Sequence, residues 1–412
     1  MNTLFVAPKL HRVLRPAAET PPLRDRFAAH VAEATLAMLD PDIIEAMGED
    51  LRIVQKHRVH HAGLLVCAMI LAAVERGSDF EGRWLDTQTT YRRLGGPDSG
   101  TTSIRKMGRR MRPLLKQIMR RRMDQIIAET RDRRLQGRLS VFRDVLIPDG
   151  CAFKLASLLS GVYPGTGQPA ELKLHAVYSV KAGTATSIQS SAGSVHDSDG
   201  FWPERWEAGA LYIWDLGYNS HERFIDAVQG GAVVLQRLKE GANPIALASY
   251  GPTGTKRLLV DDDGRPLRLN EACEWAVHRQ PVLDLDVEIV DDRRRKVLAR
   301  VVCVPFGGED RYYLTVLPRD VFSPHDVAEL YRVRWEVELF FKGWKGGARL
   351  DHVHRLKNPD SLAVAVTASM LAALLSRDLH ARLERLADDD AEPANDVAAS
   401  DAFPPCGGAA RP

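Results

Sequence analysis

The sequence has few cysteines, no internal repeat and almost no net charge. Its five cysteines, in a chain of 412 residues, are scattered at positions 67, 151, 273, 303 and 406, which excludes a disulfide framework and favours a reducing cytoplasm. The apolar run Ala62–Val74 is too short to cross a membrane. No signal peptide is recognised after Met1. We therefore expect a cytoplasmic protein that does not bind a membrane.

The most informative segment is Tyr331–Lys345, with the sequence YRVRWEVELFFKGWK. Ser323 followed by Pro324 is typical of the start of a helix, and the pair Gly346 and Gly347 is typical of its end. Between these signals the sequence predicts a single helix of about twenty residues.

Four polar residues of this helix are expected to share one face, because offsets of 0, 3, 7 and 14 residues span an arc of roughly 60°. A carboxylate that can hold a metal ion, beside cations that can hold phosphate, suits phosphodiester chemistry. An ordinary surface helix with solvated ion pairs would show the same spacing. The four residues are Tyr331, Arg334, Glu338 and Lys345.

Two further acids follow apolar runs of strand-like composition. Val145–Pro148 leads to Asp149, and Leu211–Trp214 leads to Asp215; each acid stands at a turn that contains glycine. We expect both carboxylates at strand ends, although a turn-forming aspartate is the simpler interpretation of either one alone. Asp197 lacks a preceding apolar strand, so we interpret it as a turn and helix-entry residue.

Taken together, these segments resemble the bacterial DDE transposases of the insertion-sequence-four family. The family pattern Tyr-x2-Arg-x3-Glu-x6-Lys is matched at all four positions, and a chance match is on the order of one in several hundred. Asp215, Gly217 and Tyr218 are similar to the family's second block. At the first acid the family usually has Ser or Thr after Asp-Gly, where this chain has Cys151. The resemblance covers about Leu146–Leu386.

The resemblance implies a catalytic triad of Asp149, Asp215 and Glu338 that holds two Mg²⁺ ions, with Mn²⁺ able to replace them. Asp149 would bridge the two ions. Water attack would free a 3′-hydroxyl, which would then attack target DNA without any nucleotide cofactor. The expected partners are double-stranded DNA, as terminal repeats and target, and a second copy of the chain in a homodimer at the bacterial nucleoid. Phosphates near the scissile bond are expected at Tyr331, Arg334 and Lys345.

The order of apolar runs predicts an α/β (α+β) fold with a ribonuclease-H-like core, whose first strand we expect at Ser140–Pro148. The expected division has a helical N-terminal domain at 1–138 that binds DNA, and a catalytic core at 139–240 and 318–386. A β-rich insertion is expected at 241–317, and an acidic, disordered tail at 387–412.

The segment Arg105–Arg138 carries thirteen basic residues against three acids, and its apolar residues recur at helical spacing. We expect one basic amphipathic helix there. Its polar face is either simply solvated or a phosphate-binding surface, and the acids downstream favour the second interpretation. The expected DNA-binding residues on it are Arg109, Arg110, Arg112, Lys116 and Arg120.

Three alternatives remain open at this point. A metal-dependent nuclease of the same fold would cut DNA without joining it. A DNA-binding regulator would have lost catalysis and kept the N-terminal domain. A glycoside hydrolase would use paired carboxylates on sugar and ignore Mg²⁺, but the basic segment gives it no support.

Overall fold

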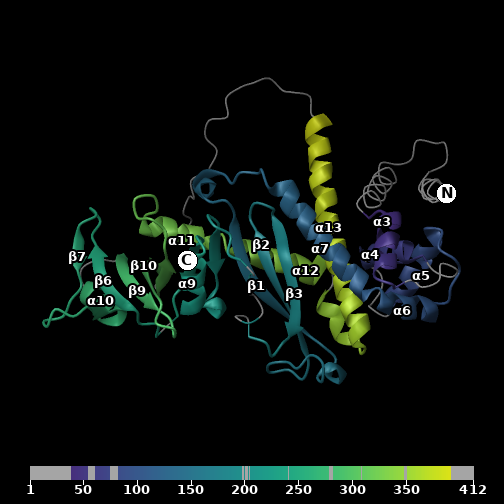
Figure 1. Cartoon of the computed structure of the whole chain (residues 1–412), viewed down its shortest axis with the longest axis horizontal. Helices are drawn as coiled ribbons and strands as arrows, with labels where there is room; N and C mark the ends of the chain where they lie inside the picture. Colours follow the sequence, from purple (N-terminus) through teal and green to yellow (C-terminus); the bar gives the residue numbers. More distant parts are fainter. Residues whose placement is uncertain are drawn as a thin grey trace, which may run out of the picture.

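The computed structural model describes residues 39–53, 61–74, 82–196, 199, 203, 205–239, 241–277, 282–307, 309–347 and 350–390. Asp197, most of the expected tail and the first 38 residues of the expected N-terminal domain lie outside the described residues. Figure 1 shows the helices α3–α6 at the right of the molecule, the strands β1–β3 in the centre and the strands β6, β7, β9 and β10 at the left.

The N-terminal part is helical wherever the structure describes it. The expected single helix over Arg105–Arg138 is wrong: the chain forms two helices that meet at the buried Met111, followed by the 3₁₀ helix η1 (Gly137–Val141). Pro113 explains the break, because proline has no backbone N–H and fits the first turn of a new helix. The helices are α3 (Pro41–Asp50), α4 (Ala62–Val74), α5 (Arg83–Arg93), α6 (Thr101–Arg110) and α7 (Arg112–Thr130).

Within the described residues, eleven strands form one mixed sheet in the order β3-β2-β1-β4-β5-β11-β10-β9-β6-β7, with β8 paired to β6. The strands are β1 (Val145–Lys154), β2 (Glu171–Ser179), β3 (Thr184–Ala192), β4 (Leu211–Trp214), β5 (Val233–Arg237), β6 (Ile245–Tyr250), β7 (Lys256–Leu258), β8 (Leu267–Arg268), β9 (Leu283–Val290), β10 (Lys296–Phe306) and β11 (Glu309–Thr315). The strands of the expected insertion therefore continue the central sheet through β11.

Parallel pairing at the centre of the sheet sets the relative height of the first two acids. Val145 of β1 pairs with Leu211 of β4, and Leu146 pairs with Tyr212. The paired residues are 66 positions apart in the sequence, and the same offset continued along both strands brings Asp149 level with Asp215. The apolar runs that precede the acids are buried on both faces, as the central strands of a covered sheet are expected to be.

The bounds of β1 differ from those expected from the sequence. The strand begins at Val145, because Gly137–Val141 forms η1, and it continues past Asp149 to Lys154. Asp149 thus lies inside β1, paired with Ala176 of the antiparallel β2, and not at a strand end. The long hairpin partner β2 explains this, because it pairs with β1 well beyond the end of β4.

The C-terminal helices pack on the sheet and on the N-terminal helices. They are α11 (Pro324–Arg332), α12 (Trp335–Gly347) and α13 (Pro359–Asp390), with α9 (His221–Gln229) and α10 (Leu269–Val277) on preceding segments. Figure 1 shows α13 beside α7, between the central strands and the N-terminal helices, and the two helices are in contact. Pro359–Leu379 has the length and composition to cross a membrane, but 61% of its most apolar window is buried inside the structure. It therefore serves as a core helix.

A buried ion pair holds the segment that leads into α11. Arg300 of β10 donates two hydrogen bonds to Asp284 of β9, at 2.8 and 2.7 Å, and its third nitrogen bonds the carbonyls of Leu317 and Phe322. Arg300 is 3% exposed, so its charge depends on these partners. The insertion strands thereby fix the position at which α11 begins.

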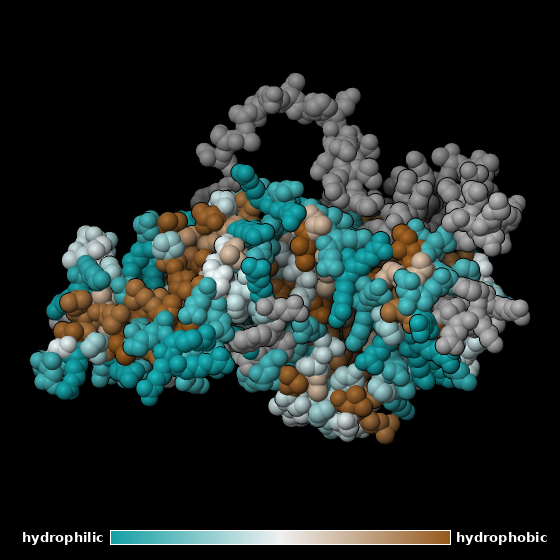
Figure 2. Space-filling model, viewed as in Figure 1, coloured by the Kyte–Doolittle hydropathy of each residue, from teal (hydrophilic) through white to brown (hydrophobic). Residues whose placement is uncertain are grey.

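The outer surface is mainly hydrophilic over the centre and right of the molecule. Figure 2 shows that apolar surface gathers over the insertion strands at the left. This part of the chain carries Leu258 and Leu298, which are 67% and 61% exposed. Contiguous exposed apolar surface is typical of a region that contacts a partner.

The start of β1 depends on the buried carboxylate of Asp144, which gives the first stability prediction. It accepts hydrogen bonds from the Ser179 hydroxyl at 2.6 Å and from the backbone N–H groups of Val145 and Lys181. Asp144→Ala would leave these donors without an acceptor, and we expect a loss of about 2–4 kcal/mol in the free energy of unfolding. Urea denaturation measures this loss.

The matched control is Asp132→Ala, because Asp132 is exposed. It should change the free energy of unfolding by less than about 0.5 kcal/mol. Equal effects of the two variants would contradict a structural role for Asp144.

Candidate active site

Helix α11 begins where the sequence predicts. Ser323 accepts a hydrogen bond from the N–H of Asp326, and the Asp326 carboxylate accepts one from the N–H of Ser323, which completes a capping box with Pro324 in the first turn. Val327 and Leu330 face the core. The cap and this apolar stripe together fix the start and the rotation of the helix.

The expected single helix up to Lys345 is wrong, because the chain breaks between α11 and α12. The N–H of Val333 bonds the carbonyl of Leu330, and the N–H of Arg334 bonds the carbonyl of Tyr331, so the turn is tightened to 3₁₀ spacing. Arg334 lies in this break. The single helix is therefore interrupted at Arg334, but Tyr331, Arg334 and Glu338 still face one site, as their spacing predicts.

The guanidinium of Arg334 lies among the three predicted catalytic acids. Its Nη1 atom is 3.9 Å from Asp149 Oδ2, its Nε atom is 4.0 Å from Asp215 Oδ1, and its Nη2 atom contacts Glu338 Oε1. The Arg334 side chain is 18% exposed. Burial alone would lower the pKa of Arg334, but Asp215, Tyr331 and Glu338 raise it above its ordinary value. The structure thus brings together all three acids and the motif arginine.

Tyr331 connects the same site to the sheet. Its hydroxyl donates to Asp215 Oδ1 at 3.3 Å, and its ring packs on Tyr313 of β11 with the ring centres 5.1 Å apart. Burial raises the pKa of Tyr331, and the charge of Asp215 raises it further, whereas Arg334 and Arg237 lower it. The phenol therefore stays protonated and keeps its role as a donor.

Lys345, the last residue of the motif, faces the part of β1 that follows Asp149. Its ammonium lies 5.9 Å from the ring centre of Phe153 and interacts with the thiol of Cys151. Burial raises the pKa of Cys151, and Lys345 lowers it. Cys151 and Phe153 follow Asp149 on the same face of β1, so Lys345 lies next to the acid along the strand.

Arg237 also reaches this site, although it is not among the site residues predicted from the sequence. It is the last residue of β5 and pairs with Tyr313, so both side chains lie on one face of the sheet. Its charge acts on Tyr331 and on Tyr313. The signal in the sequence is its place at the end of a buried strand parallel to the strand that precedes Asp215.

The donor set fits a hard divalent cation, because three carboxylates already surround one positive charge. As the side chains stand, however, the part of the chain that the structure describes contains no group of three or more His, Cys, Asp or Glu residues close enough to hold a metal ion. The guanidinium occupies the space between the acids.

The five predicted DNA-binding residues on α6 and α7 have three kinds of surroundings. Arg109 donates to the Ser361 hydroxyl at 2.8 Å, and Arg112 pairs with Asp360 at 3.2 Å, so both bind the first turn of α13. Arg110 is exposed. Lys116 and Arg120 line a groove of about 570 Å³ between α7, α13 and the edge strand β3, which presents hydroxyl and amide side chains to it.

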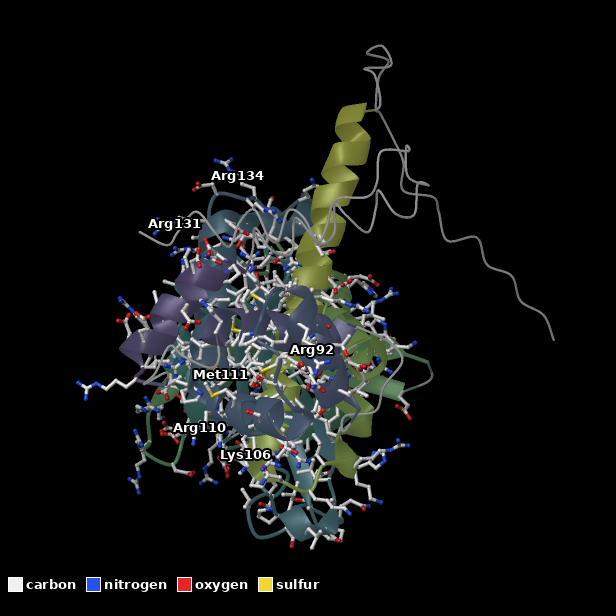
Figure 3. The ribbon with its side chains drawn as sticks, turned by 90° about the vertical axis from the view of Figure 1, so that its right-hand side faces the viewer. Arg92, Lys106, Arg110, Met111, Arg131 and Arg134 are labelled. Carbon is white, nitrogen blue, oxygen red and sulfur yellow. The ribbon has the colours of Figure 1, made fainter. Side chains whose placement is uncertain are left out.

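Basic residues also lie on the outer face formed by these helices and by the segment that follows α7. Figure 3 shows Lys106 and Arg110 pointing outward at the lower part of this face, and Arg131 and Arg134 near its upper end. All four are exposed. The positive charge of the segment is therefore spread over the face and does not form one narrow stripe.

A model of the transposase DDE domain matches residues 143–375, which is more than half of the chain. The chain belongs to the transposase DDE-domain family. The matched region contains β1, β4 and α12, and therefore all three acids around Arg334. This match confirms the resemblance found in the sequence motifs.

Several curated transposases are similar to this member of the DDE-domain family. The transposase of insertion sequence element IS231F from Bacillus thuringiensis subsp. israelensis is 25% identical over 254 residues, which is 53% of each chain. That of IS231B from Bacillus thuringiensis subsp. berliner is 24% identical over 284 residues, or 60% of this chain and 59% of the relative. That of IS421 from Escherichia coli is 42% identical over 145 residues, or 35% and 37%. The chain spans about half the length of the two IS231 relatives.

The capping box of α11 gives a prediction for this DDE domain. Ser323→Ala removes the side chain that caps α11, and we expect a loss of about 1 kcal/mol in the free energy of unfolding. Ser323→Asp should preserve most of the stability, because aspartate caps a helix equally well. Urea denaturation of both variants measures the difference. Ser140→Ala, at an exposed residue of η1, is the control and should be neutral.

Proposed function

We propose that this chain is a transposase that cleaves element-end DNA and joins the freed 3′ end to target DNA. The observation that carries the proposal is the convergence of Asp149, Asp215 and Glu338 on one cation, within the region matched by the DDE domain. Cleavage of a phosphodiester requires charge stabilisation at both the attacking and the leaving oxygen. A cluster of three acids beside several cations suits that requirement.

The three acids would hold two divalent metal ions, with Mg²⁺ expected and Mn²⁺ as a substitute. When bound, such ions activate the attacking oxygen and stabilise the leaving one. Asp149 lies in β1, Asp215 directly follows the neighbouring parallel strand β4, and Glu338 lies in α12, so all three ligands are anchored to elements of the core. Rigid support of this kind keeps ligands in place through the reaction.

The protein's own cations would bind and orient the DNA phosphates. Lys345 lies beside Asp149 along β1, and Arg237 lies on the Tyr331 side near Asp215. The scissile phosphate would then lie between them. Tyr331 stays protonated because burial and Asp215 raise its pKa, so its hydroxyl can donate to a phosphate oxygen.

The fold proposal is a ribonuclease-H-like core formed by β3-β2-β1-β4-β5, with α11 to α13 packed against it. The antiparallel hairpin β1–β2–β3 followed by the parallel strands β4 and β5 supports this assignment. On the basis of the same strand pairing, we propose the following division of the chain: a helical part at 1–138, a core at 139–240 and 318–386, and an insertion at 241–317.

DNA would also contact the basic helices. Lys116 and Arg120 line the groove beside β3, and Lys106 and Arg110 point outward from α6. Phosphate contacts from lysine and arginine supply most of the sequence-independent affinity for DNA. A homodimer would be needed to hold two element ends together, and a nucleoid-associated location in the cytoplasm would follow from this function.

The first test is cleavage of the flanking element's end DNA with Mg²⁺ or Mn²⁺. Asp149→Ala, Asp215→Ala and Glu338→Ala should each reduce cleavage by at least about 100-fold, because each acid helps to place charge at the reacting phosphate. Circular dichroism and DNA-binding assays would show that each variant still folds and binds. Glu329→Gln, at an exposed acid on α11 that pairs with Arg332, is the matched control and should retain activity.

The outcomes separate the proposal from its alternatives. Cleavage that survives any one of the three substitutions removes that residue from the site. Cleavage without joining to a target favours a nuclease of the same fold. Tight, specific binding without cleavage by the intact protein favours a DNA-binding regulator.

The basic helices give a separate prediction on salt dependence. If Lys116 and Arg120 each contact a phosphate, the double variant Lys116→Gln/Arg120→Gln should bind DNA more weakly. Its slope of log K against log salt concentration should also be smaller in magnitude by about 2. Fluorescence anisotropy at several salt concentrations measures this slope. Arg265→Gln, at an exposed residue of the insertion, is the control, and an equal change there would indicate a non-specific effect of net charge.

A further inference from the structure

Arg334 interacts with the acids in an unusual way for a phosphate-binding residue. Each of three guanidinium nitrogens is directed to a different carboxylate, with Nη1 at 3.9 Å from Asp149, Nε at 4.0 Å from Asp215 and Nη2 in contact with Glu338. The side chain is four-fifths buried. Two of these separations exceed hydrogen-bond length, so the attraction there is between charges and not through a fixed hydrogen bond.

The backbone supports this position of Arg334. The residue lies in the 3₁₀ turn between α11 and α12, and its Nη2 atom reaches Glu338 in the first turn of α12. Arg332, two residues earlier, pairs with Glu329 in solvent at 3.2 Å. The two arginines are close in sequence, but residues two apart point to different sides of the chain, so their partners differ.

We propose that Arg334 is an internal cation that competes with divalent metal ions for the three carboxylates. In the metal-free protein it holds the acids together by offsetting their mutual repulsion. Metal ions held by the same oxygens require the guanidinium to leave, because a second positive charge cannot share that space. The released guanidinium then becomes available to a DNA phosphate. This inference rests on the proposed metal-dependent function.

A consequence follows for the order of events. The acids are already gathered before metal ions arrive, so the site does not have to assemble against like-charge repulsion. When metal ions displace Arg334 from the carboxylates, its positive charge also stays beside the site at the stage when DNA phosphate is present. Arg334 is thus a positioning residue toward the carboxylates, in addition to any contact that it makes with DNA.

The test is metal binding without DNA, measured on the full chain by isothermal titration calorimetry and by Mn²⁺ electron paramagnetic resonance. Arg334→Gln should bind Mn²⁺ at least about fivefold more tightly than the unaltered protein, because the competing charge has been removed. Arg332→Gln, which loses the same charge from an exposed site, should bind as the unaltered protein does. A change smaller than fivefold in Arg334→Gln, or weaker binding, overturns the inference.

A second measurement separates this role from a purely structural one. Arg334→Gln should melt at a lower temperature than the unaltered protein in EDTA, where the acids lose the positive charge that they share. Saturating Mn²⁺ should remove most of this difference. A melting temperature that falls equally in both conditions indicates general destabilisation and counts against competition. Arg334→Lys retains a positive charge on a shorter side chain and provides a variant that folds if Arg334→Gln does not. Its melting temperature in EDTA should fall by less than that of Arg334→Gln.

The two hypotheses fail in different ways in these experiments. If neither the unaltered protein nor any variant binds Mn²⁺ or Mg²⁺, the proposed metal-dependent function itself is wrong. If all of them bind metal with one affinity and the triad variants still abolish cleavage, the function stands and the competition is wrong.

Discussion

Three carboxylates cannot lie close together in a partly buried site without positive charge between them. At a separation of 4 Å and an effective dielectric constant of 20, two unit charges interact with roughly 4 kcal/mol, so each added acid carries a substantial penalty. Arg334 supplies one charge that is shared by Asp149, Asp215 and Glu338. The bend that places Arg334 there is therefore as important to the site as the acids themselves.

The rest of the structure serves to hold that arrangement. The parallel register of β1 and β4 sets Asp149 level with Asp215, and the buried Arg300 fixes the segment that leads into α11. The capping box at Ser323 then determines where α11 starts, and hence where the chain bends. The insertion strands are distant in sequence from the acids, yet through Arg300 they help to position Glu338.

The sequence predicted the features that depend on local chemistry. Ser323 and Pro324 predicted the start of α11, and the apolar runs before Asp149 and Asp215 predicted buried strands. It did not predict the bend at Arg334, because no proline or glycine marks that position and the cause is tertiary, through packing of α11 and α12 on different parts of the sheet. The break before α7 had a local signal in Pro113, which the apolar stripe concealed. Residue spacing nevertheless predicted that Tyr331, Arg334 and Glu338 face the same site, because the interruption is a short 3₁₀ turn.

Cys151 is the position where the chain departs from the usual Ser or Thr of the family, and its surroundings explain why a thiol can stand there. The side chain is 5% exposed, and burial raises its pKa, so the thiol stays neutral next to Asp149. A neutral, buried cysteine packs as a small apolar residue and adds no charge to a site that already holds three acids. A thiolate in the same place would increase their repulsion. Lys345 beside the thiol keeps a positive charge at this end of the site. The substitution therefore preserves the charge balance on which the proposed chemistry depends.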